Sequence, residues 1–275
     1  MTSVLARAEI IDRLKDTVSQ GRPIIASGAS AGIVAKCAEL GGTDLLIVYS
    51  TGKSRIMGLP TTRLGDSNAV TLQMCEEISN VVNNTPIIGG IEATDPTRLN
   101  LDRLLTRFLD AGYSGVINFP TVGIFDASYR NRRESVGLGF AREVELMALA
   151  RRRDVFTMAY CFNPEDAAAM AKAGVDCMIA HAGPTRGGLV GFAGKNEDQG
   201  CETVNRIIAA SRQVNPDIIC LAHGGPFATP EDTKLLYSRT EAQGFVGASS
   251  IERIPIERAV IDVVKQFKSI SLANS

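Results

Sequence analysis

Short runs of apolar, often β-branched residues alternate with longer amphipathic segments along this chain of 275 residues. Such runs predict strands, and apolar positions that recur every three to four residues predict helices. We expect strands at residues 23–27, 44–49, 86–92, 115–118, 155–160, 175–180, 218–222 and 244–247. A segment with helical spacing follows each, at residues 31–40, 70–82, 99–111, 141–153, 164–173, 201–214, 230–243 and 256–267.

Eight strand-then-helix units predict an α/β fold, a single (β/α)8 TIM barrel over residues 1–275. The strand runs show little polar alternation, as expected when helices cover the barrel and side chains fill it. Apolar positions in residues 1–21 predict an extra N-terminal helix that closes the bottom of the barrel. An open doubly wound sheet is disfavoured, because the turn from Ser27 to Gly32 lacks the G-x-G-x-x-G pattern.

Charge and apolar content exclude several classes of protein. The 29 Lys+Arg and 30 Asp+Glu leave a net charge of −1, which argues against nucleic acid as a partner. No apolar run approaches the length of a membrane span, and charged residues among the first 16 positions argue against a targeting segment. We therefore expect a cytoplasmic protein. The six cysteines form no C-x-x-C pair, so we expect reduced thiols.

Function in such barrels is sought directly after each strand, where the active-site loops begin. Both histidines of the chain, His181 and His223, fall at strand ends. They are candidate acid/base residues, the alternative being that they only bridge loop backbone groups. Further polar or small residues at these ends are expected to contact a substrate: Ser27, Gly28, Tyr49, Lys53, Asn118, Tyr160, Gly224, Gly225, Ser249 and Ser250.

Glu92 follows an apolar strand and is the best-placed carboxylate, with Glu252 second. A carboxylate at the mouth of a barrel is costly unless it is paired or used, so it is either an acid/base residue or the partner of an arginine such as Arg98. With His181 and His223 it could also form a two-histidine, one-carboxylate metal site. A divalent cation, Mg²⁺ or Zn²⁺, is the candidate cofactor. The sequence assigns no other ligands to such a metal.

Three rim segments exceed the usual loop length, at residues 50–68, 121–140 and 183–199. Their length suggests lids over the mouth of the barrel. The third is rich in glycine and carries Arg186 and Lys195, which could present positive charge to an anionic ligand.

Several phrases at the strand ends, among them GGIEATDP, GVINFPTVG, AHAGPTRGG and LAHGGP, resemble the phosphoenolpyruvate hydrolase-like family of TIM-barrel signal-transduction proteins. The resemblance covers nearly the whole chain. It implies a phosphoenolpyruvate/pyruvate-binding barrel whose substrate is a small 2-oxo acid or its phospho or phosphono derivative. A cluster of aspartates that would hold Mg²⁺ at the strand ends, as in better-known members of this fold group, is not apparent.

Three functions remain open from the sequence. The first is a hydrolase or lyase that uses Glu92 or a histidine as acid/base. The second is a barrel that binds or senses a small anionic metabolite without turnover, since a fold does not decide function. The third is a metal-dependent aldolase built on Glu92, His181 and His223. A homo-oligomer is expected for a barrel of this group.

Overall fold

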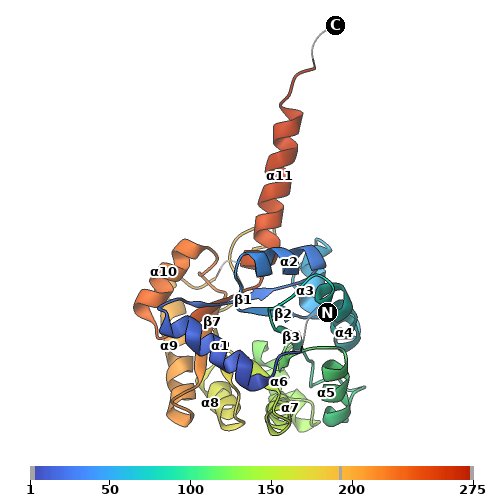
Figure 1. Cartoon of the computed structure of the whole chain (residues 1–275). Helices are drawn as coiled ribbons and strands as arrows, with labels where there is room; N and C mark the ends of the chain where they lie inside the picture. Colours follow the sequence, from blue (N-terminus) through green and yellow to red (C-terminus); the bar gives the residue numbers. More distant parts are fainter. Residues whose placement is uncertain (1–3, 192–193, 273–275) are drawn as a thin grey trace.

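The strands close into one parallel barrel in which neighbours in sequence are neighbours in space (Figure 1). The computed structural model describes residues 4–191 and 194–272. The strands are β1 (Ile24–Gly28), β2 (Leu45–Val48), β3 (Ile87–Gly90), β4 (Gly115–Ile117), β5 (Phe156–Cys161), β6 (Cys177–His181), β7 (Ile219–His223) and β8 (Gly244–Gly247). Pairing of β1 with β8 closes the circle. The TIM-barrel prediction is thus confirmed.

Helices follow the strands, and most of them form the outer layer. They are α1 (Arg7–Ser19), α2 (Gly32–Leu40), α3 (Ser50–Ile56), α4 (Ser67–Ser79), α5 (Leu101–Asp110), α6 (Ala127–Ser135), α7 (Phe140–Arg152), α8 (Pro164–Lys172), α9 (Glu197–Val214), α10 (Pro230–Arg239) and α11 (Ile254–Lys268), with short turns η1 (Val122–Ile124) and η2 (Ser249–Arg253). Two of the expected rim loops contain α3 and α6, which were not predicted. Neither segment buries an apolar stripe that periodicity could reveal.

Strand residues alternate between two apolar clusters. One cluster fills the barrel and includes Leu45, Ile88 and Phe156. The other lies between the barrel and the helices and includes Leu46 and Ile87. Because side chains alternate along a strand, the inward set continues toward the carboxyl ends of the strands and reaches the functional rim.

Helix α1 lies across the amino-terminal end of the barrel. Its Ile10 and Leu14 are buried in the cluster that fills the barrel. Arg7 pairs with Asp176 at 2.7 Å, which ties the start of this helix to the loop before β6. The extra N-terminal helix expected from the sequence is therefore present.

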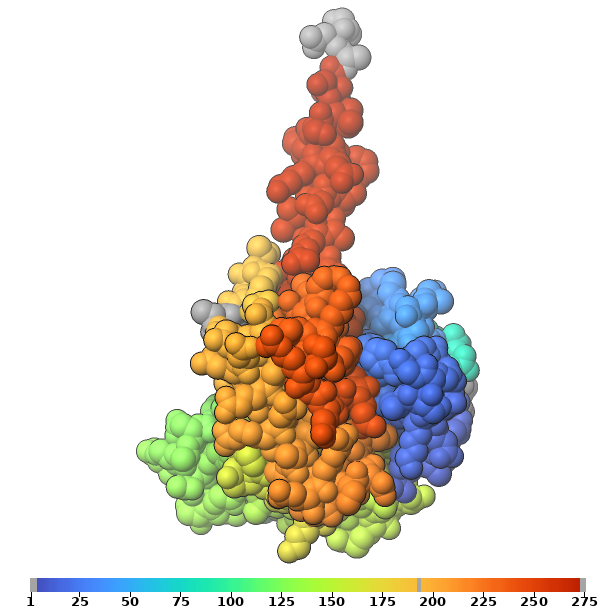
Figure 2. All heavy atoms as spheres, turned by 90° about the vertical axis from the view of Figure 1, so that its left-hand side faces the viewer, coloured from blue at the N-terminus to red at the C-terminus, as the bar shows by residue number. Residues whose placement is uncertain are grey.

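Helix α11 departs from the expected pattern. It continues from η2 and projects away from the barrel in two perpendicular views (Figures 1 and 2). The expectation that the last helix packs on the barrel like the others was wrong. At the β8–β1 seam, where a packed last helix would lie, there is instead an apolar groove of about 650 Å³ between α2 and the first turns of α11.

Candidate functional site

A cavity of about 130 Å³ lies at the carboxyl ends of the strands. It is smaller than the ~300–1,000 Å³ typical of pockets for drug-sized ligands, so it suits a small metabolite. Five residues that the sequence placed at the site line this cavity, namely Tyr49, Tyr160, His181, His223 and Ser249. They meet here because their side chains lie at the inward-facing, carboxyl-terminal ends of β2, β5, β6, β7 and β8.

Backbone groups hold the two imidazoles in different tautomers. Nδ1 of His181 accepts a hydrogen bond from the backbone N–H of Gly183 at 3.1 Å. Nδ1 of His223 lies 2.7 Å from the carbonyl oxygen of Val246, and it carries the proton because a carbonyl only accepts. A neutral imidazole has one N–H and one lone pair. Nε2 of His181 is therefore a donor, and Nε2 of His223 is an acceptor.

Both rings are enclosed and uncharged at neutral pH. Burial lowers the pKa of His223 to about 4. Burial, and then the neighbouring His223, hold the pKa of His181 well below its ordinary value. Desolvation disfavours the charged imidazolium, so this pair offers one neutral donor and one neutral acceptor to a ligand.

Tyr160 stands beside both histidines. Its ring centroid lies 5.5 Å from that of His181 and 5.2 Å from that of His223. Its buried hydroxyl lies near the side chain of Tyr49 but makes no geometrically acceptable hydrogen bond among the residues that the structure describes. Burial raises the pKa of Tyr160 well above its ordinary value, so the hydroxyl keeps its proton. A buried O–H without a partner is costly, and a ligand in the cavity would satisfy it.

Arg55 is a site residue that the sequence analysis missed. It lies on α3, lines the cavity and forms a buried ion pair with Glu252 of η2. Its guanidinium carbon lies 5.5 Å from the ring centroid of Tyr49, and its Nε has no partner within the described chain. A Cβ on Gly28 would lie 2.9 Å from the Glu252 carboxylate, so this glycine makes room for the ion pair. No periodicity in residues 50–56 signals a buried arginine.

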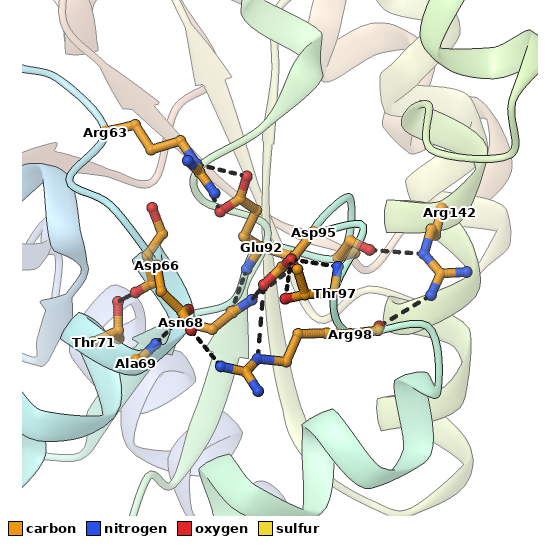
Figure 3. A network of polar contacts seen from close by, with 12 residues as sticks. Arg63, Asp66, Asn68, Ala69, Thr71, Glu92, Asp95, Thr97, Arg98 and Arg142 are labelled. Carbon is orange, nitrogen blue, oxygen red and sulfur yellow. Dashed lines mark hydrogen bonds and ion pairs between the residues drawn. The ribbon is translucent and has the colours of Figure 1, made fainter.

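Glu92 belongs to a separate polar network that links β3 to the rim loops (Figure 3). Its carboxylate accepts hydrogen bonds from Nε of Arg63 at 2.9 and 3.0 Å, and its backbone N–H donates to Asn68 at 2.9 Å. Its partner is thus Arg63, and the suggested Arg98 instead pairs with Asp66. Burial raises the pKa of Glu92 although Arg63 opposes the shift. Glu92 does not line the cavity of the two histidines.

Asn118 lies behind the cavity wall. Its side chain accepts from the backbone N–H of Tyr160 at 2.8 Å and donates to Glu143 at 2.8 Å. Glu143, on α7, is fully buried and also accepts from Thr121 and from the backbone of Val122. Burial raises the pKa of Glu143 to about 8. This cluster connects α7 to the segment that carries Tyr160.

Two other expected residues point away from the cavity. Ser27 faces outward on β1, where its hydroxyl lies 2.8 Å from that of Thr43, and it lines the groove beside α2. Lys53 lies on α3, half-exposed, with Nζ 4.0 Å from Glu77. Neither side chain joins the histidines.

Gly224 and Gly225 support the loop that covers the cavity. The backbone N–H of Gly225 donates to the carbonyl of Gly183 at 2.7 Å. Gly224 has a φ of +71°, and a Cβ there would lie 2.2 Å from the Gly183 carbonyl oxygen, so a glycine is required. Ser250 lies in η2 beside Ser249 but does not line the cavity.

The third rim segment also lies over the cavity, to which it contributes Pro184, Thr185 and Val190. The cations expected to face a ligand are used elsewhere. Arg186 pairs with Asp232 at 3.1 Å, and Lys195 donates to Thr203 at 2.7 Å. Arg253, at the end of η2, lines the cavity instead and pairs with Glu257 at 2.6 Å.

The polar groups that line the cavity do not suit the coordination of a divalent cation. In the described parts of the chain, no three His, Cys, Asp or Glu side chains are placed to hold a metal ion, so the site of Glu92, His181 and His223 is not assembled. No aspartate or glutamate is among the described residues that line the cavity. Mg²⁺ requires oxygen ligands, and His181 presents an N–H rather than a lone pair.

Comparisons with known proteins agree with this architecture. The phosphoenolpyruvate hydrolase-like family matches residues 9–270. The ToMV susceptible protein tm-1(GCR26) and the ToMV resistance protein Tm-1(GCR237) of Solanum lycopersicum are each 41% identical over 272 residues, which is 97% of this chain. This chain spans only 36% of the length of either tomato protein.

A solved structure of phosphonopyruvate hydrolase in complex with oxalate and Mg²⁺ has the same fold, with a TM-score of 0.61, 19% identity, and coverage of 98% of this chain and 87% of that one. A 2,3-dimethylmalate lyase of the PEP mutase/isocitrate lyase superfamily gives a TM-score of 0.63 at 14% identity, with coverage of 100% of this chain and 91% of that one.

Within the described residues, no helix combines the length and apolar character that a bilayer crossing demands.

Proposed function

Since the chain belongs to the phosphoenolpyruvate hydrolase-like family, we propose that it is a hydrolase or lyase that acts on a small 2-oxo acid or on its phospho or phosphono derivative. One observation carries this proposal. The neutral donor of His181 and the neutral acceptor of His223 share a small cavity, with ring centroids 4.7 Å apart. Such a pair can hydrogen-bond a developing oxyanion and move a proton at the same time.

For phosphonopyruvate the proposed reaction is hydrolysis. The oxygen of water bonds to phosphorus, and the C–P bond breaks with its electron pair left on carbon. The products are phosphate and the enolate of pyruvate, which is then protonated on that carbon. The N–H of His181 would stabilise the enolate oxygen. Nε2 of His223 would take the proton from water and return it to the carbon.

The first test is pyruvate release from phosphonopyruvate and from phosphoenolpyruvate, with and without divalent cations. His223→Ala is expected to lower the rate at least 100-fold, because proton transfer by a positioned group contributes about 10²–10⁴-fold. Tyr237→Phe serves as a control, since Tyr237 also has a buried hydroxyl without a partner among the described residues but lies on α10 outside the cavity. Absence of release from both compounds under every condition would refute this substrate class.

A second candidate function is a regulatory barrel that binds the same metabolite without turnover. It is favoured by the names of the tomato relatives and by a Sinorhizobium fredii relative described as a putative transcriptional regulatory protein, 32% identical over 96% of this chain and 44% of its own length. Ligand binding in the cavity without product formation would support this candidate.

We also propose that the protein is a homo-oligomer, a dimer in which two copies exchange α11. Apolar residues of α11 recur at spacings of four and three, at Ile256, Val260, Val263 and Phe267, and Val260 and Phe267 are 54% and 76% exposed. Each copy has one such helix and one apolar groove at its β8–β1 seam. If each copy places its α11 in the groove of the other, the apolar face of both helices and both grooves are covered, as in a two-fold symmetric interface.

A further inference from the structure

Three residues that line the rim cavity carry hydrogen-bond donors that make no hydrogen bond within the described part of the chain. They are the hydroxyl of Tyr160, the Nε–H of Arg55 and the Nε2–H of His181. The first two are buried and have no partner among the described residues. Buried donors without acceptors are unfavourable, so an arrangement of three around one cavity indicates an anionic or strongly accepting ligand.

Acceptors in the same cavity are few. Nε2 of His223 carries a lone pair and can accept a hydrogen bond. Glu252 does not line this cavity, because it lies behind Arg55 and faces the groove between α3 and α11. Glu92 is held by Arg63 in the separate network of Figure 3. A dication entering here would meet the guanidinium of Arg55 and the N–H of His181, which cannot coordinate it, and no carboxylate among the described residues that line the cavity.

We infer that this cavity binds the planar anion of a 2-oxo acid directly, on Tyr160, His181 and Arg55, without a divalent cation. The inference rests on the proposed function and specifies how its substrate is held. A 2-oxo acid carries a carboxylate next to a carbonyl oxygen. The guanidinium N–H of Arg55 suits the carboxylate. The hydroxyl of Tyr160 and the N–H of His181 then suit the carbonyl oxygen, which becomes the enolate oxygen during reaction.

Oxalate is the probe, because it has the size, planarity and charge of this enolate. Calorimetry with the full chain is carried out in EDTA and again in excess Mg²⁺. We expect dissociation constants within about twofold of each other in the two buffers. Tyr160→Phe should weaken oxalate binding at least tenfold in EDTA, and Tyr237→Phe should leave it unchanged.

The two histidines allow a second readout that does not depend on activity. In ¹⁵N-labelled protein their side-chain signals report the tautomers directly. We expect the Nε2–H form for His181 and the Nδ1–H form for His223, with oxalate in EDTA shifting the His181 Nε2 signal. This readout also shows whether the Tyr160→Phe variant keeps the folded site.

The outcomes separate the two proposals. Oxalate binding that requires Mg²⁺, or equal binding by Tyr160→Phe and wild type, overturns the inference and leaves the proposed reaction standing. Oxalate binding in EDTA without pyruvate release supports the inference and favours the regulatory barrel. No binding in either buffer overturns the inference, and if pyruvate release is also absent, the proposed substrate class fails with it.

Discussion

His181 and His223 lie side by side at the ends of β6 and β7, paired in register, with ring centroids 4.7 Å apart. One accepts from a backbone N–H through Nδ1, and the other donates to a backbone carbonyl through Nδ1. Identical side chains in adjacent strands therefore present opposite hydrogen-bonding groups to one cavity. The difference comes entirely from the backbone around each ring.

Burial of His223 makes stability depend on pH. Its pKa is about 4 in the folded protein against an ordinary 6.5. Between pH 6.5 and pH 4, His223 binds a proton in the unfolded chain but not in the folded protein. The free energy of unfolding therefore falls as the pH drops from 6.5 to 4. The shift corresponds to about 3 kcal/mol at the acidic end. Urea unfolding at pH 7.5, 5.5 and 4.5 measures it, and His223→Asn should show a shallower decline. An equal decline in both proteins would contradict this assignment.

Glu143 is expected to stabilise the segment from Asn118 to Val122, which lies behind Tyr160. Glu143→Gln replaces one acceptor oxygen by an NH₂ group that faces the donors of Asn118, Thr121 or Val122. We expect a loss of about 1–3 kcal/mol at pH 5. The folded-state pKa of about 8 lies above the ordinary 4.5, so the wild type loses stability as the pH rises through this window, and the cost of the substitution should shrink.

Urea unfolding of this variant at pH 5 and pH 8.5 measures both effects. Glu145→Gln on the exposed face of the same helix is the matched control and should cost less than about 0.5 kcal/mol. A cost of Glu143→Gln that stays constant between pH 5 and pH 8.5 would show that the carboxyl group is already ionised at pH 5.

Glu92 is expected to organise the rim rather than to contact the ligand. Glu92→Gln keeps the size of the side chain but removes the charge that pairs with Arg63. We expect oxalate affinity within about threefold of wild type, because the residue does not line the cavity. Arg63 is half-exposed, so the loss of the pair should cost less than about 1 kcal/mol. A loss of binding as large as that of Tyr160→Phe would place Glu92 at the ligand after all.

Helix α11 should control the oligomeric state. Val260→Asp combined with Val263→Asp puts two charges on its apolar face, and we expect the dissociation constant of the dimer to rise at least 100-fold. Light scattering after size-exclusion chromatography measures this. Gln266→Asp on the same helix tests whether added charge alone has this effect and should leave the dimer intact.

Disulfide cross-linking in the groove tests the proposed exchange of α11 directly. Cys37 is exposed and lines it. A cysteine at Val260 should therefore form a disulfide with Cys37 of the other copy under mild oxidation, giving a covalent dimer. A monomeric wild type at about 100 μM, or cross-linking confined within one chain, would rule out the exchange.

The sequence was a good guide to the elements of the barrel and a partial guide to its site. All eight strands lie where apolar runs predicted them, since burial on both faces of a parallel strand leaves a clear local pattern. His181, His223 and Tyr160 line one cavity, as expected, because strand ends in a barrel converge on one rim. Arg55 lines the cavity without having been predicted, and Glu92 was predicted but does not line it, because both positions depend on which rim loop covers which strand end. That choice is made by contacts between residues far apart in the chain.

What the sequence determined by itself is the closed barrel, its extra first helix and the set of polar residues at its rim, because these follow from local periodicity and from a topology with few alternatives. Tertiary structure alone decided the tautomers of the two imidazoles, the partners of Glu92 and Arg55, and the departure of α11 from the β8–β1 seam. Each of these depends on long-range contacts, such as that between Arg55 and Glu252, which are 197 positions apart in the chain, and no local pattern encodes such a contact.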